Sequence, residues 1–150
     1  MATWSDFASA SPRLAEKARE RLHGRVGYLG TIRSDGSPRV HPVTPIVGER
    51  ELFVFMEPTS PKGYDLRRDP RYQLHAGVED TNGDGGELYV RGSAQLIDDA
   101  ATRQRAVEAC SYRPAGRYIL FVFGVDEAML TTYDEAGPVR ERWPRRKAQT

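Results

Sequence analysis

The first regular pattern in the chain is helical. Between residues 11 and 23, apolar residues recur at every fourth position, at Leu14, Ala18 and Leu22, and so form one stripe along a helix. Ser11 is a favourable N-cap, Pro12 suits the first helical position, and Gly24 follows the last turn. The pattern predicts an amphipathic helix over residues 11–23.

After Gly24 the hydrophobic period shortens to two, which is typical of strands. The predicted strands cover residues 26–33, 38–46, 51–56, 72–78, 87–97, 118–125, 128–133 and 139–143. Asp35-Gly36 is a hairpin turn signal between the first two. Pro42 and Pro45 cannot donate to a ladder, so the second strand is expected to lie at an edge, to be bulged or to be short. Gly92 predicts a bulge or a tight bend inside the longest strand.

Two further helices complete the prediction. The first covers about residues 62–68 and ends before Pro70, and the second runs from Asp99 to about Cys110. The strands follow one another without regular strand–helix alternation, so the chain is expected to be mainly β, an antiparallel barrel, closed or nearly so, with peripheral helices. We expect a single domain over residues 1–150, with the barrel over about 26–143 and a tail at 144–150.

Composition narrows the class of protein. The chain has 150 residues, with 22 Lys+Arg and 21 Asp+Glu, so its formal net charge is +1. This balance argues against a nucleic-acid or membrane-surface protein. The single cysteine, Cys110, excludes an internal disulfide and a cysteine metal cage, and its position on the apolar side of a helix predicts a core residue. Without a signal-peptide pattern or a membrane-spanning run, we expect a cytoplasmic protein.

The most suggestive polar residues stand where a loop enters the helix at residues 62–68. Ser60 and Lys62 lie at this helix start, where unpaired N–H groups and the positive end of the dipole favour an anion. Two interpretations remain open from the residues alone. Either the hydroxyl and the ammonium complete a phosphate site, or Ser60 is only the helix cap and Lys62 is solvated.

A second candidate group lies on the preceding hairpin. Arg39, His41 and Val43 share one face of the predicted strand. Arg39 is either a phosphate ligand or an exposed edge charge, and His41 is either a proton donor or a hydrogen-bonded surface residue. No metal-binding spacing of histidines and no nucleophile elbow occurs, so we predict neither a metal site nor a nucleophile.

Basic residues also gather at two other places. They surround the first helix at Arg13, Lys17, Arg19, Arg21 and Arg25, and they end the chain at Arg140, Arg142, Arg145, Arg146 and Lys147. The first group is diluted by glutamates and is expected to be a solvated helix face. The second is denser, and an anionic cofactor site, an RNA surface and a frayed tail are all open interpretations of it. Because stacking aromatic residues are not interleaved with it, we do not favour nucleic-acid binding.

Taken in order, these motifs resemble the pyridoxamine 5′-phosphate oxidase-like FMN-binding split-barrel family. The resemblance is carried by R-V-H-P-V at 39–43, S-x-K-x-x-D-L-R-R-D-P-R at 60–71 and ELYVRGSAQLIDD at 87–99, and it covers about residues 14–99. It implies a split β-barrel homodimer with a flavin in each of two crevices between the subunits.

The resemblance also assigns residues to the cofactor. They are Arg39, His41, Pro42, Val43, Met56, Glu57, Ser60, Lys62 and Trp143. Arg39, Ser60 and Lys62 would hold the FMN phosphate, and residues 41–43 and 56–57 would line the isoalloxazine ring. Trp143, with Arg142, would cover the flavin of the other subunit.

The function that the resemblance implies is an FMN-dependent oxidoreductase in which hydride passes through flavin N5 to or from a small molecule. The cofactor carries the redox step, so no side chain is assigned a catalytic role. Residues 135–146 do not match the substrate motif of true pyridoxamine phosphate oxidases, which argues against that substrate. Two alternatives stay open: a reductase that uses the deazaflavin coenzyme, and a non-catalytic protein that binds flavin or haem.

Overall fold

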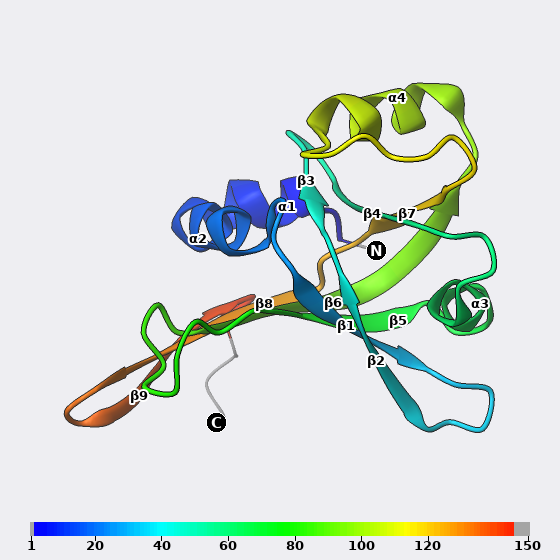
Figure 1. Ribbon diagram of the computed structural model, residues 1–150. Coiled ribbons are helices and arrows are strands. Elements are labelled where there is room, and N and C mark those ends of the chain that lie inside the picture. The colour runs from blue at the N-terminus through cyan, green and yellow to red at the C-terminus, as the bar shows by residue number, and fades with distance from the viewer. Residues whose placement is uncertain (1, 146–150) are drawn as a thin grey trace.

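A computed structural model describes residues 2–145 of the chain (Figure 1). Its helices are α1 (Trp4–Ala10), α2 (Pro12–Leu22), α3 (Pro61–Arg68) and α4 (Ala100–Ala109). Its strands are β1 (Gly27–Ile32), β2 (Pro38–Val43), β3 (Ile46–Val47), β4 (Leu52–Met56), β5 (Arg71–Ala76), β6 (Glu87–Ile97), β7 (Ile119–Phe123), β8 (Glu127–Asp134) and β9 (Gly137–Trp143).

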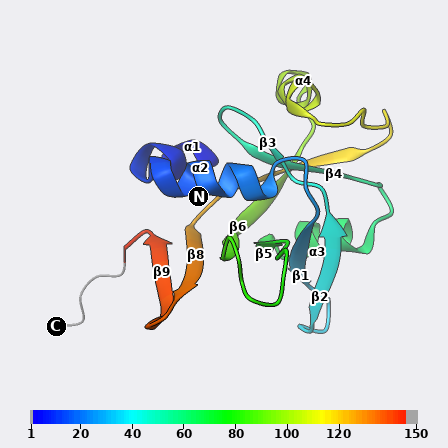
Figure 2. The ribbon, with the colours of Figure 1, turned by 60° about the vertical axis from the view of Figure 1, so that its left-hand side comes forward.

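The strands form one curled antiparallel sheet in the order β2-β1-β5-β6-β7-β4-β3, with β8 beside β6 and β9 beside β8. The long strand β6 joins the two halves of this sheet. Its first part pairs with β5 and β8, and its last residues, 94–97, pair with β7. The predicted fold class, a mainly β antiparallel split barrel with peripheral helices, is therefore confirmed (Figure 2).

Gly92 lies where β6 passes from one half of the sheet to the other. A Cβ atom at this position would lie 2.3 Å from the carbonyl oxygen of Gly124. The Tyr72 hydroxyl donates a hydrogen bond of 2.7 Å to that same oxygen. Glycine is needed here because another backbone approaches the strand closely, which is a different reason from the bulge or tight bend that the sequence predicted.

Helices α1 and α2 close the concave side of the sheet. Trp4, Phe7 and Leu22 are fully buried in the main core, where the Trp4 and Phe7 rings meet edge to face at 5.3 Å. The sequence pattern did not predict α1, which begins with a capping box between Thr3 and Asp6. Helix α2 occupies the span in which a helix was predicted.

The prediction of one strand over residues 38–46 is wrong. Strand β2 ends at Val43, and β3 pairs with β4 in the other half of the sheet. Pro45 lacks an N–H, and its carbonyl accepts from the Gly24 backbone at 2.9 Å, so the chain leaves the first ladder at this point. Cys110 also differs from expectation, because it follows the last turn of α4 and is only partly buried.

No helix within residues 2–145 is both long and apolar enough to cross a bilayer.

Candidate functional site

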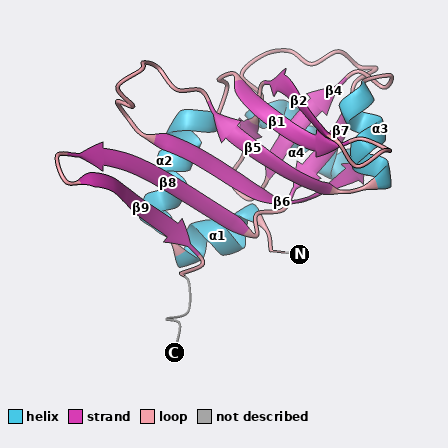
Figure 3. Ribbon diagram, turned by 90° about the horizontal axis from the view of Figure 1, so that it is seen from below, coloured by secondary structure: helices cyan, strands magenta, loops and turns pink. Residues whose placement is uncertain are grey.

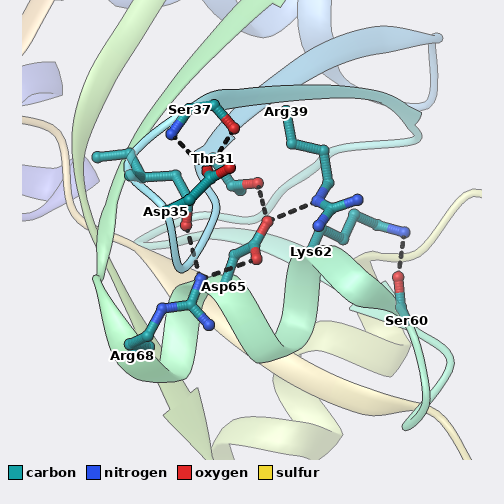
Figure 4. Close-up of polar contacts among 9 residues, drawn as sticks. Thr31, Asp35, Ser37, Arg39, Ser60, Lys62, Asp65 and Arg68 are labelled. Carbon is teal, nitrogen blue, oxygen red and sulfur yellow. Dashed lines mark hydrogen bonds and ion pairs between the residues drawn. The ribbon is translucent and has the colours of Figure 1, made fainter.

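The candidate site begins where β4 leads through a short turn into α3. All five residues of β4 are buried, so the strand holds the start of α3 against the barrel. The Ser60 hydroxyl does not cap the helix and instead accepts a hydrogen bond of 2.7 Å from Lys62 Nζ (Figure 4). Burial lowers the pKa of the Lys62 ammonium. Ser60 is thus the N-cap residue of α3 by position, but its hydroxyl bonds Lys62, which is partly buried, rather than the helix backbone.

The hairpin of β1 and β2 brings Arg39 to the same place. Alternation along β2 turns Arg39, His41 and Val43 inward and leaves Val40 and Pro42 exposed, as the sequence predicted. In Figure 4 the Arg39 and Lys62 side chains extend toward the same side of α3. Partial burial, the Lys62 charge and the Arg39 charge together lower the pKa of His41 below its ordinary value of 6.5. The structure thus brings these three basic groups close enough to interact electrostatically.

A buried carboxylate that sequence reasoning missed connects these elements. Asp65 of α3 is 3% exposed, and it accepts hydrogen bonds from Thr31 Oγ1 at 2.8 Å, Arg39 Nε at 2.7 Å and Arg68 Nη2 at 3.1 Å. Burial pushes the pKa of Asp65 upward, but the hydrogen bonds from Arg39, Thr31 and Arg68 outweigh it and hold the pKa below its ordinary value. Asp65 is therefore ionised near neutral pH.

The charges of this group do not cancel. Arg39, Lys62 and Arg68 are cations, and within residues 2–145 the carboxylate that pairs with Arg39 and Arg68 is Asp65, so the four side chains carry a net charge of +2. Arg68 is the last residue of α3, so the cations beside the first turn are Arg39 and Lys62, in a place where backbone N–H groups have no intrahelical acceptor. Two cations at a helix start suit an anion such as a phosphate monoester.

The residues predicted to line a flavin ring differ in how far they are exposed. Val43 and Met56 are buried, and the thioether of Met56 lies against α3, 3.2 Å from where a Gly63 Cβ would be. Pro42 is exposed at the edge strand. The Glu57 carboxylate binds Arg117 through two hydrogen bonds, one of them 2.9 Å from Arg117 Nε, and these bonds lower its pKa.

Trp143 does not join the site within one chain. Its ring packs on Phe7 of α1 at 5.2 Å, and β9, the strand that it ends, lies on the other side of the sheet from α3 (Figure 1). The neighbouring Arg142 donates a hydrogen bond of 2.6 Å to Glu127, a buried carboxylate that also accepts from Arg91 and Tyr89. A role for Trp143 over a cofactor thus requires a second subunit.

The other basic residues have structural contacts. Arg19 donates to the carbonyls of Val47 and Gly48, and Arg21 donates to those of Gly77 and Gly85. These two residues therefore do more than line a solvated helix face. Arg146 and Lys147 lie outside the described residues. Within residues 2–145, no group of three or more metal-ligating side chains comes together.

Comparison with known proteins relates this geometry to a family. The family model described as pyridoxamine 5′-phosphate oxidase matches residues 14–118. A search of curated proteins gave no match.

Several solved structures share the fold. The heme binding protein of Mycobacterium smegmatis has a TM-score of 0.65 at 20% identity over 87% of this chain, which spans 58% of that protein's length. General Stress Protein 26 from Bacillus anthracis str. Sterne has a TM-score of 0.60 at 21% identity, over 77% of this chain and 91% of its own. PhzG from Burkholderia lata 383, solved with tetrahydrophenazine-1-carboxylic acid, has a TM-score of 0.61 at 16% identity, over 95% of this chain and 87% of its own. At these identities the likeness extends to the fold alone.

Proposed function

Because this chain belongs to the pyridoxamine 5′-phosphate oxidase family, we propose that it binds FMN and acts through it as an oxidoreductase on a small molecule. The observation that supports this most directly is the grouping of Arg39, Ser60 and Lys62 at the start of α3. These three side chains come from two separate segments of the chain. Their meeting at a helix N-terminus fits the terminal phosphate of FMN.

The residues present suit each part of such a phosphate. Arg39 and Lys62 would supply the positive charge, and the Ser60 hydroxyl would supply a further hydrogen bond. A phosphate monoester carries about −1.5 to −2 charges at pH 7, and Arg39 and Lys62 are the two cations that would meet it.

The isoalloxazine ring would lie between residues 41–43 of β2 and residues 56–57 at the end of β4. Val43 and Met56 are core side chains, so the ring would meet these segments mainly through their backbone. Among the described residues β2 is an edge strand, and the side of it that faces away from β1 can bond to a ligand. Bound FMN would supply hydride transfer at N5. The protein would hold and orient the ring and keep water from it, and no side chain is proposed as a general acid or base.

A second copy of the chain would complete the site. The convex face of the sheet carries no helix (Figure 3), and it presents Tyr28 at 49% exposure and Val40 at 65%. We propose that this face forms a homodimer interface. In that dimer, Trp143 of one subunit would cover the cofactor of the other, which explains why Trp143 lies far from α3 within one chain.

The test is a comparison of FMN with riboflavin, which lacks the phosphate. Purified protein should show the two visible absorption bands of flavin, and the apoprotein should bind FMN more tightly than riboflavin. Arg39→Ala and Lys62→Ala should each weaken FMN binding by about 1–3 kcal/mol, or roughly 5- to 150-fold, in a fluorescence titration. Lys17→Ala is the matched control, because Lys17 pairs with Glu141 elsewhere in the molecule. Unchanged FMN affinity in both site variants would exclude this phosphate site.

A haem-binding function is the second candidate. The similarity to the heme binding protein of Mycobacterium smegmatis supports it, and Arg39 and Lys62 could pair with the propionates of haem as they could with a phosphate. The absorption spectrum of the purified protein distinguishes the two, because haem gives a Soret band and flavin does not. Retention of the deazaflavin coenzyme in preference to FMN would identify the third alternative.

A further inference from the structure

We propose that Asp65 is a positioning residue for the anion site. In this inference, which rests on the proposed function, the buried carboxylate fixes the Arg39 guanidinium so that its two terminal amino groups are presented to the phosphate. Asp65 itself would not touch the ligand. Its role would be exerted through Arg39.

Three hydrogen bonds hold the Asp65 carboxylate in one orientation. Its Oδ2 atom accepts from Arg39 Nε at 2.7 Å and from Thr31 Oγ1 at 2.8 Å, while Oδ1 accepts from Arg68 Nη2 at 3.1 Å. The residue is 3% exposed, and so is Thr31. A buried carboxylate is costly unless it is paired and hydrogen-bonded, and three donors meet that requirement here.

The geometry of the Arg39 bond matters as much as its presence. Asp65 takes the Nε edge of the guanidinium, and within residues 2–145 neither Nη1 nor Nη2 of Arg39 makes a hydrogen bond. Two donors in a planar fork therefore remain for a ligand, and this fork matches the oxygens of a phosphate. A long side chain held at Nε loses less conformational freedom when it binds an anion.

Three elements are locked together by this carboxylate. Thr31 and Arg39 are directly paired residues of β1 and β2, and both donate to Asp65 of α3. Asp65 follows Lys62 by three residues, so the two stand about one turn apart on the helix. The same turn of α3 thus supplies Lys62 as a proposed phosphate ligand and, through Asp65, orients Arg39 as the other.

Two roles for Asp65 predict opposite effects of removing its charge. If Asp65 acted only through its charge, Asp65→Asn would raise the net charge of the four-residue group from +2 to +3 and would strengthen phosphate binding. If Asp65 positions Arg39, the variant would weaken phosphate binding in spite of the extra positive charge. A neutral amide oxygen accepts from the Arg39 guanidinium less strongly than a carboxylate does, and the amide NH2 group that replaces Oδ1 would face the Arg68 donor.

The experiment measures FMN and riboflavin dissociation constants of the apoprotein by fluorescence titration. Asp65→Asn should weaken FMN binding about 10- to 100-fold and leave riboflavin binding unchanged, because riboflavin has no phosphate. Thr31→Val, which removes one donor to Oδ2 without changing any charge, should weaken FMN binding by a smaller factor, and Thr31→Ser should restore it. Asp69→Asn is the matched control, since Asp69 pairs with Arg71 on the surface.

Each outcome of this titration supports or overturns the positioning role of Asp65. Tighter or unchanged FMN binding by Asp65→Asn, or an equal loss for FMN and riboflavin, would overturn the positioning role. If Asp65→Asn does not fold, the FMN-to-riboflavin affinity ratio of Thr31→Val decides in its place. If the wild-type protein itself does not prefer FMN over riboflavin, the proposed phosphate site is wrong and the positioning role fails with it. A wild-type preference that survives in both variants overturns the positioning role alone.

Discussion

His41 is the histidine of the candidate site. Its pKa is lowered by partial burial and by the nearby charges of Lys62 and Arg39. The surroundings of His41 therefore favour the neutral imidazole more than water does. The pKa of Asp65 is also lowered, but for a carboxyl group this favours the charged form. Hydrogen bonds outweigh the effect of its burial.

The lowered pKa of His41 predicts a pH-dependent stability. As the pH falls below about 6.5, the unfolded chain takes up a proton on His41 before the folded chain does, so the folded state loses stability until its own lowered pKa is passed. Above that window the contribution is fully present. The melting temperature of the apoprotein should therefore fall between pH 7 and pH 5 less steeply in His41→Gln than in the wild type. Parallel melting curves for the two proteins would contradict this assignment.

Strand β6 is the element on which the shape of the barrel depends. It pairs with β5 and β8 along its first part and with β7 along its last residues. The change occurs beside Gly92, where the Gly124 carbonyl lies too close for any side chain. Since β7 pairs in turn with β4, and β4 leads into α3, the path of β6 also determines where Lys62 lies.

Gly92→Ala should therefore destabilise the protein. The added Cβ would meet backbone atoms of Gly124 and Asp126, which cannot move as the end of a flexible side chain can. We expect a loss of about 1–3 kcal/mol in the free energy of unfolding, measured by urea denaturation. Gly116→Ala is the control, because nothing lies within 4 Å of its added methyl group, and it should change stability by less than about 0.5 kcal/mol. Equal effects of the two substitutions would disprove the close-approach argument.

At the level of elements, the sequence predicted most of the strands and the three helices with clear boundaries. It missed α1, although the capping box of Thr3 and Asp6 and the spacing of Trp4 and Phe7 were a usable signal. The sequence pattern predicted β2 and β3 as one strand, because alternation alone cannot tell which partner a strand segment pairs with.

In the candidate site, Arg39, Ser60 and Lys62 were predicted from the residues around them in the sequence. Asp65 was not, since nothing local marks one charged residue of a helix as buried.

At the scale of the whole molecule, the two faces of the sheet differ in what covers them. Helices α1 and α2 close the concave face, whereas the convex face has no helix (Figure 3). On that face Tyr28 lies opposite Pro42 and His75, and Gly30 lies opposite Val40 and Gln73. Exposed apolar residues in adjacent rows of one sheet are typical of a surface that binds another protein.

The homodimer proposal predicts that one charge on this face separates the subunits. Val40 is 65% exposed in the single chain, so Val40→Asp should leave the fold intact while it places a carboxylate in the interface. Wild-type protein should sediment as a dimer and Val40→Asp as a monomer. Val107→Asp, on α4 at 38% exposure, should remain dimeric.

The dimer also predicts a change in ligand affinity. The proposed phosphate ligands all belong to one chain, whereas both subunits would cover the flavin ring. The monomeric variant should therefore bind FMN and riboflavin more weakly by the same factor. A monomeric wild type, or a variant that stays dimeric, would refute this interface, and a selective loss of FMN would show that the second subunit contacts the phosphate as well.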